Sequence, residues 1–266
     1  MHPMLTTAVR AARSAGDLIV RAFDRVDELT VDTKGPHDFV TQVDRAAEEA
    51  IVGALHKAYP DHAIMGEEGG THTKGDRYRW IIDPLDGTTN FLQGLPHFAV
   101  SIALEVDGKL DQGVIYDPVK NDLFLASRGA GAHLNERRIR VPERKGIEGS
   151  VLATGFPFKY PELMEAYLDS FRSFIRHTSG IRRWGSAALD LAYTACGRYD
   201  GYWELKLNPW DTAAGALIVR EAGGIVTDFD GGDDFFGTGN ILAASPRVHR
   251  AMLAELRERI PADLRR

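Results

Sequence analysis

The sequence predicts an α+β protein, and three patterns support this prediction. Apolar residues recur at helical spacing in two stretches of the first 58 residues. Between residues 98 and 141, short apolar segments separated by turn residues indicate successive antiparallel strands. After residue 150, strand and helix patterns alternate. At 266 residues the chain is long enough for one large domain or for two sub-domains that share an interface.

The first part of the chain is expected to form two amphipathic helices. Residues 3–25 form the first, with apolar side chains along one face. In residues 27–39, a Gly-Pro pair indicates a hairpin or a mobile loop. Thr41, with Asp44 three residues later, predicts a capping box at the start of the second helix. A Tyr-Pro pair at residues 59–60 predicts its end.

The central part is expected to be mainly β. A short strand at residues 63–65 leads to Glu67 and Glu68, and a polar surface loop is expected at residues 71–78. Asp107-Gly108 between two apolar stretches predicts a hairpin. The other expected strands are residues 80–82, 98–106, 110–116, 122–126 and 131–141.

A polar segment at residues 142–149 predicts a boundary between an N-terminal α+β sub-domain, residues 1–145, and a C-terminal α/β sub-domain, residues 146–266. The C-terminal part is expected to alternate between the two kinds of element. Its expected helices are residues 161–176, 186–196, 210–222 and 246–258, and its expected strands are residues 151–154, 180–184, 199–204, 224–229 and 239–243.

Composition narrows the class of protein. Hydrophobic residues make up 44% and charged residues 26%, as in ordinary globular proteins. The net charge of −6 argues against general electrostatic binding of nucleic acid. No stretch is apolar enough to span a membrane, and the N-terminal residues lack a secretory pattern. The single cysteine, Cys196, rules out an internal disulfide and is expected to have a packing role. We therefore expect a cytoplasmic protein.

The stretch from Trp80 to Phe91 carries the clearest chemical signal. A buried strand is expected to stop at Asp83, and Pro84 sets a turn. Asp86 then stands where it can cap a helix that begins with Gly-Thr-Thr-Asn. Two carboxylates at a strand end suit a hard cation, and the N–H groups of a helix start suit a phosphate. The same residues are also typical of a β-turn followed by a helix N-cap without any functional role.

Three separated segments resemble one family. Asp83-Pro-Leu-Asp-Gly-Thr-Thr-Asn90 is similar to the signature of the inositol monophosphatases, which are metal-dependent, lithium-sensitive phosphomonoesterases. Pro209-Trp-Asp-Thr-Ala-Ala-Gly215 resembles the second signature of this family, and Gly66-Glu-Glu68 its third metal-binding segment. The resemblance covers essentially the whole chain. The stretches at residues 152–158 and 183–193 look most like the bacterial branch of the family.

This resemblance implies a metal centre made by four acids. Glu67, Asp83 and the backbone carbonyl of Leu85 would hold one ion, and Asp83, Asp86 and Asp211 a second. Glu67 would help a weaker third ion near residues 34–38. Oxygen ligands without a His or Cys set point to Mg²⁺. Two to three Mg²⁺ per active site are therefore expected. On local pattern alone, Asp211 is a helix cap.

The resemblance also assigns the catalytic and substrate-binding residues. Thr88, helped by Asp44, would orient a nucleophilic water and accept its proton, although Asp44 and Thr41 are also typical helix caps. Glu204 would bind a ring hydroxyl, although a lone Glu at a strand end is usually just exposed. Ala187 would offer a backbone contact, and Ser186 would support Glu204 or the sugar. The expected substrate-binding residues are Glu67, Leu85, Asp86, Gly87, Thr88, Arg183, Ala187, Glu204 and Asp211.

Several alternatives stay open from sequence. Arg183 departs from the small polar residue of the eukaryotic enzymes and leaves the polyol undecided, and it also suits a subunit interface. His97 is interpreted as structural. The leading hypothesis is hydrolysis of inositol monophosphates such as myo-inositol 1-phosphate by a homodimer with a layered α-β-α-β-α fold. Histidinol-phosphate, fructose-1,6-bisphosphate and phosphoadenosine phosphatases are the rivals within the superfamily. A hypothesis from a different functional class is that the protein is a non-catalytic regulatory partner of transcription or ribosome-assembly machinery.

Overall fold

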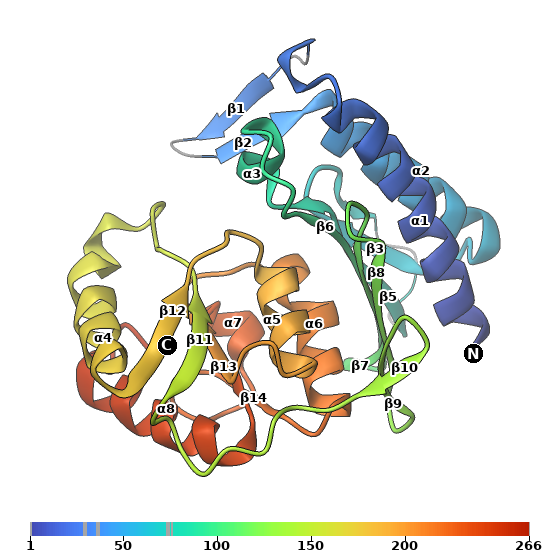
Figure 1. Ribbon diagram of the computed structural model, residues 1–266. Coiled ribbons are helices and arrows are strands. Elements are labelled where there is room, and N and C mark those ends of the chain that lie inside the picture. The colour runs from blue at the N-terminus through green and yellow to red at the C-terminus, as the bar shows by residue number, and fades with distance from the viewer. Residues whose placement is uncertain (1, 29–30, 36–37, 73–74, 76, 266) are drawn as a thin grey trace.

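The computed structural model describes residues 2–28, 31–35, 38–72, 75 and 77–265. Two helices cover one face of a large sheet, two further helices lie between this sheet and a second sheet, and a last pair covers the outer face of the second sheet (Figure 1). The fold is therefore the predicted α-β-α-β-α layered sandwich.

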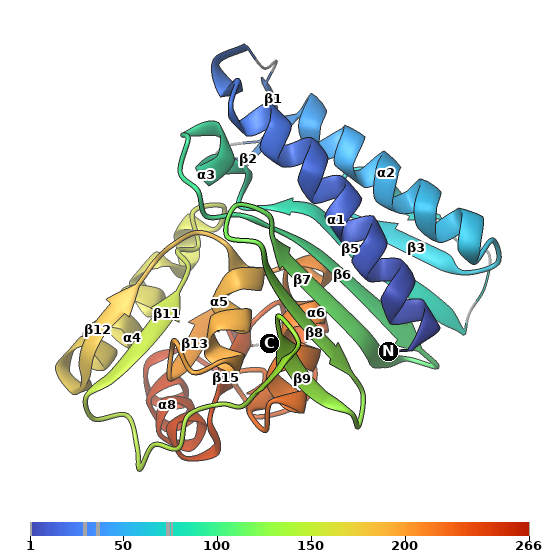
Figure 2. The same cartoon turned by 45° about the vertical axis from the view of Figure 1, so that its right-hand side comes forward.

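The outermost layer of the first half is the pair α1 (Pro3–Phe23) and α2 (Gln42–Ala58). Both helices run side by side across the larger sheet (Figure 2). Their buried residues are mostly alanine, leucine and isoleucine, and the small side chains allow close packing against the strands. Thr41 caps α2 and Asp44 completes the predicted capping box. The preceding segment forms the hairpin of β1 (Val31–Gly35) and β2 (Asp38–Thr41), which confirms the hairpin alternative.

The larger sheet has eight strands in the order β10-β9-β8-β7-β6-β5-β3-β4. Among the described strands of this sheet, only β3 and β5 pair in parallel, because the edge strand β4 reverses the chain direction between them, and the other neighbours are antiparallel. The strands are β3 (Ala63–Gly66), β4 (Gly70–His72), β5 (Tyr78–Asp86), β6 (Ala99–Val106), β7 (Lys109–Asp117), β8 (Asp122–Ser127), β9 (Gly131–Leu134) and β10 (Arg137–Ile139).

Three details of this sheet differ from the sequence-based expectation. Part of the polar loop expected at residues 71–78 belongs to the edge strand β4. The single strand expected at residues 131–141 is a hairpin, because Asn135 and Glu136 turn the chain with φ of 47° and 68°. The central strand β5 does not stop at Asp83 but pairs as far as Asp86, with an irregular register around Pro84.

Helices α5 (Ala187–Ala195) and α6 (Pro209–Glu221) lie between the two sheets. They approach closely because α6 is rich in small residues: a Cβ on Gly215 would lie 2.5 Å from Leu191. One apolar cluster joins the large sheet, both helices and the second sheet. The second sheet has the order β12-β11-β13-β15-β14. Its strands are β11 (Ser150–Thr154), β12 (Thr178–Arg182), β13 (Gly201–Glu204), β14 (Ile225–Thr227) and β15 (Ile241–Ala244).

The last layer contains α4 (Met164–His177) and α8 (Pro246–Arg259), which pack on a separate apolar cluster. The expected helices and strands of the second half are all present within a few residues. Only the four-residue α7 (Phe235–Thr238) was missed, because a single turn has no measurable periodicity. The remaining short helices are η1 (Val26–Glu28), α3 (Thr88–Leu92) and η2 (Pro161–Leu163).

The sub-domain division at residues 145 and 146 remains a prediction. It falls in the connection between Ile139, the last residue of β10, and Ser150, the first of β11. Among the described residues, no helix combines the length and the apolar character needed to cross a membrane.

Candidate active site

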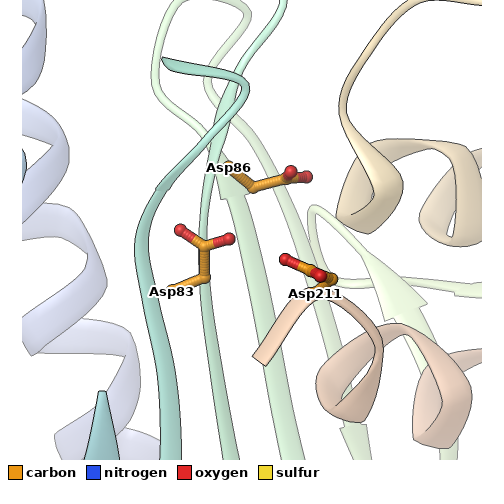
Figure 3. Close-up of side chains that lie close together, drawn as sticks. All are labelled: Asp83, Asp86 and Asp211. Atoms are coloured by element: carbon orange, nitrogen blue, oxygen red, sulfur yellow. The ribbon is translucent and has the colours of Figure 1, made fainter. Parts of the chain in front are cut away.

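Three aspartates meet at the upper end of the large sheet. Asp83 and Asp86 come from β5, and Asp211 comes from the first turn of α6. Their carboxylates point toward one another across the gap between strand and helix (Figure 3). One oxygen from each lies within 4.8 Å of the others. The β5 irregularity and the N-terminal turn of α6 therefore create one acidic cluster from distant parts of the chain.

The cluster is electrostatically unfavourable as it stands. Burial, followed by the nearby charges of Glu67, Asp86 and Asp211, raises the pKa of Asp83 well above its usual value. Burial also raises the pKa of Asp86 to about 6, although its hydrogen bonds act in the opposite direction. For Asp211, burial and the charge of Asp86 raise the pKa. A group of acids with raised pKa values is stabilised by a cation that neutralises their repulsion.

The donor set fits a hard divalent cation. The cluster offers only carboxylate oxygens, which Mg²⁺ and similar ions prefer. In each aspartate, one carboxylate oxygen accepts a backbone hydrogen bond that orients the side chain. Asp83 Oδ1 accepts from the Leu85 N–H at 2.9 Å, and Asp211 Oδ2 accepts from the Asn208 N–H at 2.7 Å. The N-cap residue of α6 is therefore Asn208 and not Asp211, which completes the capping box from the third helical position and is also a candidate metal ligand, because a carboxylate has several lone pairs.

Asp86 is tied to the second half of the molecule. Its Oδ2 accepts from the Ser186 hydroxyl at 2.5 Å and from the Ala188 N–H at 2.7 Å. The expectation that Asp86 caps a helix is wrong, because Asp86 pairs within β5 and Gly87, with φ of 101°, occupies the cap position of α3. A side chain on Gly87 would also meet the carbonyl oxygen of His97 at 3.1 Å.

Glu67 lies close to the cluster but is not among the three residues whose oxygens meet. Its charge acts on the pKa of both Asp83 and Asp211. The turn that carries Glu67 is held by Glu48 of α2. Glu48 Oε2 accepts from the Glu68 N–H at 2.9 Å, and its Oε1 accepts from the Gly69 N–H. Glu48 is only 5% exposed, so this anchor is almost shielded from water.

Thr88 and Asp44, the expected water-activating pair, are brought together. Thr88 Oγ1 lies 3.0 Å from Asp44 Oδ1 and 3.1 Å from the Leu85 carbonyl oxygen, so its proton has two acceptors. The other carboxylate oxygen of Asp44 accepts from the Thr41 N–H at 2.8 Å and from the Thr41 hydroxyl at 2.5 Å. The capping box therefore fixes the carboxylate that faces Thr88.

The expected substrate side is formed by the second half. Tyr202 donates from its hydroxyl to Glu204 Oε2 at 2.6 Å. Burial raises the pKa of Glu204 to about 7, against the effects of the Tyr202 hydrogen bond and of Arg183. Arg183 is exposed, and its guanidinium lies 5.4 Å from the centre of the Phe156 ring and 5.2 Å from that of Phe158. Ala187 is buried and is the first residue of α5, directly after Ser186, which caps this helix.

Some of the expected roles are corrected by the structure, and one concerns residues that the structure does not describe. Ser186 was expected to support Glu204 or a sugar, but its hydroxyl donates to Asp86. A third metal was expected near residues 34–38, but residues 36–37 lie outside the described residues, as do the side chains of residues 31–39. His97 is 7% exposed and burial lowers its pKa to about 4, which agrees with a structural role. Cys196 packs against the central apolar cluster, as expected.

Sequence reasoning missed two residues that organise the site. Glu48 has the pattern of an ordinary helix residue, and only its buried position on α2 sets it apart. Asn90 ends the family signature but had no assigned role. Its amide donates to the carbonyls of His97 at 2.8 Å and Trp184 at 2.7 Å, and so connects α3 to the second half. An acid four residues after Asp44, on the same helix face, was the available signal for Glu48.

Comparisons with known proteins point to one family. The inositol monophosphatase family matches residues 1–262 of the chain. A protein of Pseudomonas aeruginosa named Nus factor SuhB is 54% identical over 271 residues, with 100% of both chains covered. The solved structure of the extragenic suppressor protein suhB from Bartonella henselae has a TM-score of 0.94 at 47% identity and covers 97% of this chain and 100% of its own. The inositol monophosphatase from Anabaena has a TM-score of 0.86 at 37% identity and covers 97% of both chains.

Proposed function

The chain belongs to the inositol monophosphatase family, and from this membership we propose that it is a Mg²⁺-dependent phosphomonoesterase that hydrolyses inositol monophosphates. The observation that carries the proposal is the meeting of Asp83, Asp86 and Asp211 beside the hydrogen-bonded pair Thr88 and Asp44. A cation site next to a hydroxyl–carboxylate pair is suited to metal-assisted hydrolysis of a phosphate ester, because the cation can activate a water molecule and the pair can orient it.

The proposed metal ligands fall into two sets. Glu67, Asp83 and the carbonyl of Leu85 would hold one ion, and Asp83, Asp86 and Asp211 would hold the other. When bound, Mg²⁺ would supply an activated water and charge stabilisation for the leaving alkoxide. The orienting hydrogen bonds to Asp83, Asp86 and Asp211 support this assignment, because each fixes the direction of the remaining carboxylate oxygen.

Thr88 is proposed to orient the attacking water. With the hydroxyl proton of Thr88 directed at Asp44, the lone pairs on its oxygen are available to a water molecule. A proton leaving that water would be accepted at Thr88 Oγ1 as the hydroxyl proton passes to Asp44 Oδ1. Thr41 holds the other oxygen of Asp44, so the pair keeps its geometry during the transfer.

The phosphate and alcohol of the substrate are proposed to lie on opposite sides of the aspartates. The N–H groups of Gly87 and Thr88 begin α3 and have no partner within that helix, and they would donate to the phosphate. On the other side, Glu204 would accept from a ring hydroxyl. Arg183 and the backbone of Ala187 would contact the same polyol.

The proposal is tested by phosphate release from myo-inositol 1-phosphate, with and without Mg²⁺. The wild type is expected to release phosphate only with Mg²⁺, and Asp86→Asn is expected to lose this activity. Asp17→Asn, an exposed change on α1, is the matched control. A folded wild type that releases no phosphate from this ester would refute the assignment. Release from histidinol phosphate, fructose 1,6-bisphosphate or phosphoadenosine phosphate alone would redirect it to those rival substrates.

Two further properties belong to the same proposal. Millimolar LiCl is expected to inhibit phosphate release, and undiminished activity would contradict this. A homodimer is expected in sedimentation at micromolar concentration. A monomer under those conditions would exclude the proposed assembly.

A second candidate function is supported by the name of the Pseudomonas aeruginosa relative, Nus factor SuhB. In this function the folded chain binds transcription machinery, and catalysis is incidental. Pull-down from a bacterial lysate with the wild type and with Asp86→Asn separates the two functions. Retention of RNA polymerase components by both proteins would support a non-catalytic role. Retention by neither would reject it.

A further inference from the structure

The carboxylate of Glu204 is positioned by two features that have no part in the mechanism described above. Tyr202 and Glu204 are alternate residues of β13, so their side chains share one face of the strand. The Tyr202 hydroxyl, fully buried, donates to Glu204 Oε2 at 2.6 Å. Strand β13 is paired on both sides, with β11 and with β15, which makes it a rigid support.

Gly155 provides the space for this carboxylate. It directly follows β11, whose last residue, Thr154, pairs with Trp203. A Cβ placed on Gly155 would lie 1.8 Å from Glu204 Oε1 and 2.3 Å from Oε2. The φ of Gly155 is not in the left-handed region, so alanine fits the backbone there. The glycine is therefore needed for the Glu204 side chain and not for the course of the chain.

From this arrangement we propose that Tyr202 is a positioning residue for substrate recognition, which acts with Gly155 to hold Glu204 in one orientation. Because the Tyr202 proton occupies Oε2, the orientation of Oε1 is fixed, and no hydrogen bond to Oε1 is seen within the described part of the chain. A fixed carboxylate acceptor selects a ligand that brings a hydroxyl donor. The class of substrate is a phosphate ester of a polyhydroxylated alcohol. This inference rests on the proposed phosphatase function and specifies its alcohol subsite.

The test compares two esters. One is myo-inositol 1-phosphate, which has hydroxyls around its ring, and the other is p-nitrophenyl phosphate, which has none. Tyr202→Phe removes only the positioning hydroxyl. We expect it to raise KM for the inositol ester about fivefold relative to KM for the nitrophenyl ester, the scale of one lost hydrogen bond. The kcat for the inositol ester is expected to change less than KM, because Tyr202 touches neither the metal ligands nor Thr88.

Further variants separate positioning from stability. Gly155→Ala is expected to raise the same KM ratio by displacing Glu204, with the phenol intact. In a background of Glu204→Gln, Tyr202→Phe is expected to add little, because both changes act on one interaction. Tyr199→Phe, a buried tyrosine of the same core, is the control and is expected to leave the ratio at its wild-type value.

The outcomes are distinguishable. An unchanged KM ratio in a folded Tyr202→Phe, or an equal rise for both esters, overturns the positioning role alone. No phosphate release from either ester by the wild type overturns the proposed phosphatase function, and this inference with it.

Discussion

Glu48 provides the sharpest test of how the metal site is built. Replacing it with alanine removes a 5%-exposed carboxylate whose two oxygens accept from the N–H groups of Glu68 and Gly69. These residues directly follow Glu67 in the turn between β3 and β4. The Glu48 carboxylate also packs closely against Gly66, where a Cβ would lie 2.5 Å from Glu48 Oε2. Glu48→Ala therefore frees the turn that presents Glu67 to the aspartates, without touching a proposed ligand.

The expected magnitude follows from the two hydrogen bonds. Hydrogen bonds to a charged group make a net contribution of about 1.5–3 kcal/mol each, which already includes their exchange with water. Gly69 is exposed, so water can reach its N–H group once the Glu48 side chain is removed, and we expect a loss near the value of one such bond, about 2 kcal/mol of unfolding free energy. Partners that orient a metal ligand typically change metal affinity by about 10- to 100-fold. We therefore expect Mg²⁺ to bind about 10- to 100-fold more weakly.

Calorimetric titration of the metal-free protein with Mg²⁺ measures the affinity, and urea unfolding measures the stability. Glu48→Gln is expected to lie closer to alanine than to the wild type, since its amide N–H₂ would face a backbone N–H. Glu49→Ala, an exposed change at the next position of α2, is the control. A folded Glu48→Ala that binds Mg²⁺ with wild-type affinity would refute the reasoning, as would an equal loss in Glu49→Ala.

Three further predictions follow from the same geometry. Thr88→Val is expected to lower kcat by about 100-fold or more, and Thr88→Ser to retain most of it, because only the hydroxyl relays the proton; equal rates in steady-state assays of both variants would contradict this. Asp211→Asn is expected to raise the melting temperature of the metal-free protein, since burial and the charge of Asp86 raise the pKa of Asp211. The same variant is expected to lose the increase in melting temperature that Mg²⁺ gives the wild type. Calorimetric melting with and without Mg²⁺ measures both effects. The pKa of His97, lowered by burial to about 4 from its ordinary 6.5, means that below pH 6.5 the unfolded chain binds a proton that the folded chain does not. Stability should therefore be intact above pH 6.5 and fall by about 3 kcal/mol as the pH falls to 4, and urea unfolding of His97→Gln should show a smaller fall.

The order of helices and strands was predictable because it depends on local periodicity. The apolar stripes of α1 and α2, the turn at Asp107 and Gly108, and the capping box at Thr41 all have signals within a few residues. The short elements β4 and α7 have no such signal, since three or four residues cannot show a period. Their existence is decided by neighbours in space.

The candidate site likewise contains residues that have a sequence signal and contacts that have none. Asp83, Asp86 and Asp211 were recognisable because each lies in a segment that resembles a family signature, and the structure brings the three together. The hydrogen bonds from Ser186 and Ala188 to Asp86 join residues about one hundred positions apart, and no local pattern announces them. The two oxygens of Glu48 likewise meet a turn twenty residues away. What the sequence could not predict is therefore the set of hydrogen bonds that supports Asp86 and the turn of Glu67.

That support explains how a folded chain tolerates three acids at one point. Each carboxylate has one oxygen bound by a backbone N–H: Asp83 by Leu85, Asp86 by Ala188, Asp211 by Asn208. Such bonds stabilise the ionised form and oppose the burial that raises the three pKa values, together with the neighbouring charges that add to it at Asp83 and Asp211. They also hold each carboxylate in one orientation, in a cluster where one oxygen of each aspartate lies within 4.8 Å of the others. The same bonds thus lower the free energy of the cluster in the metal-free protein and orient the carboxylates for a cation. Ligand removal and support removal should therefore have opposite effects on the metal-free protein: Asp211→Asn stabilises it by relieving repulsion, whereas Glu48→Ala destabilises it.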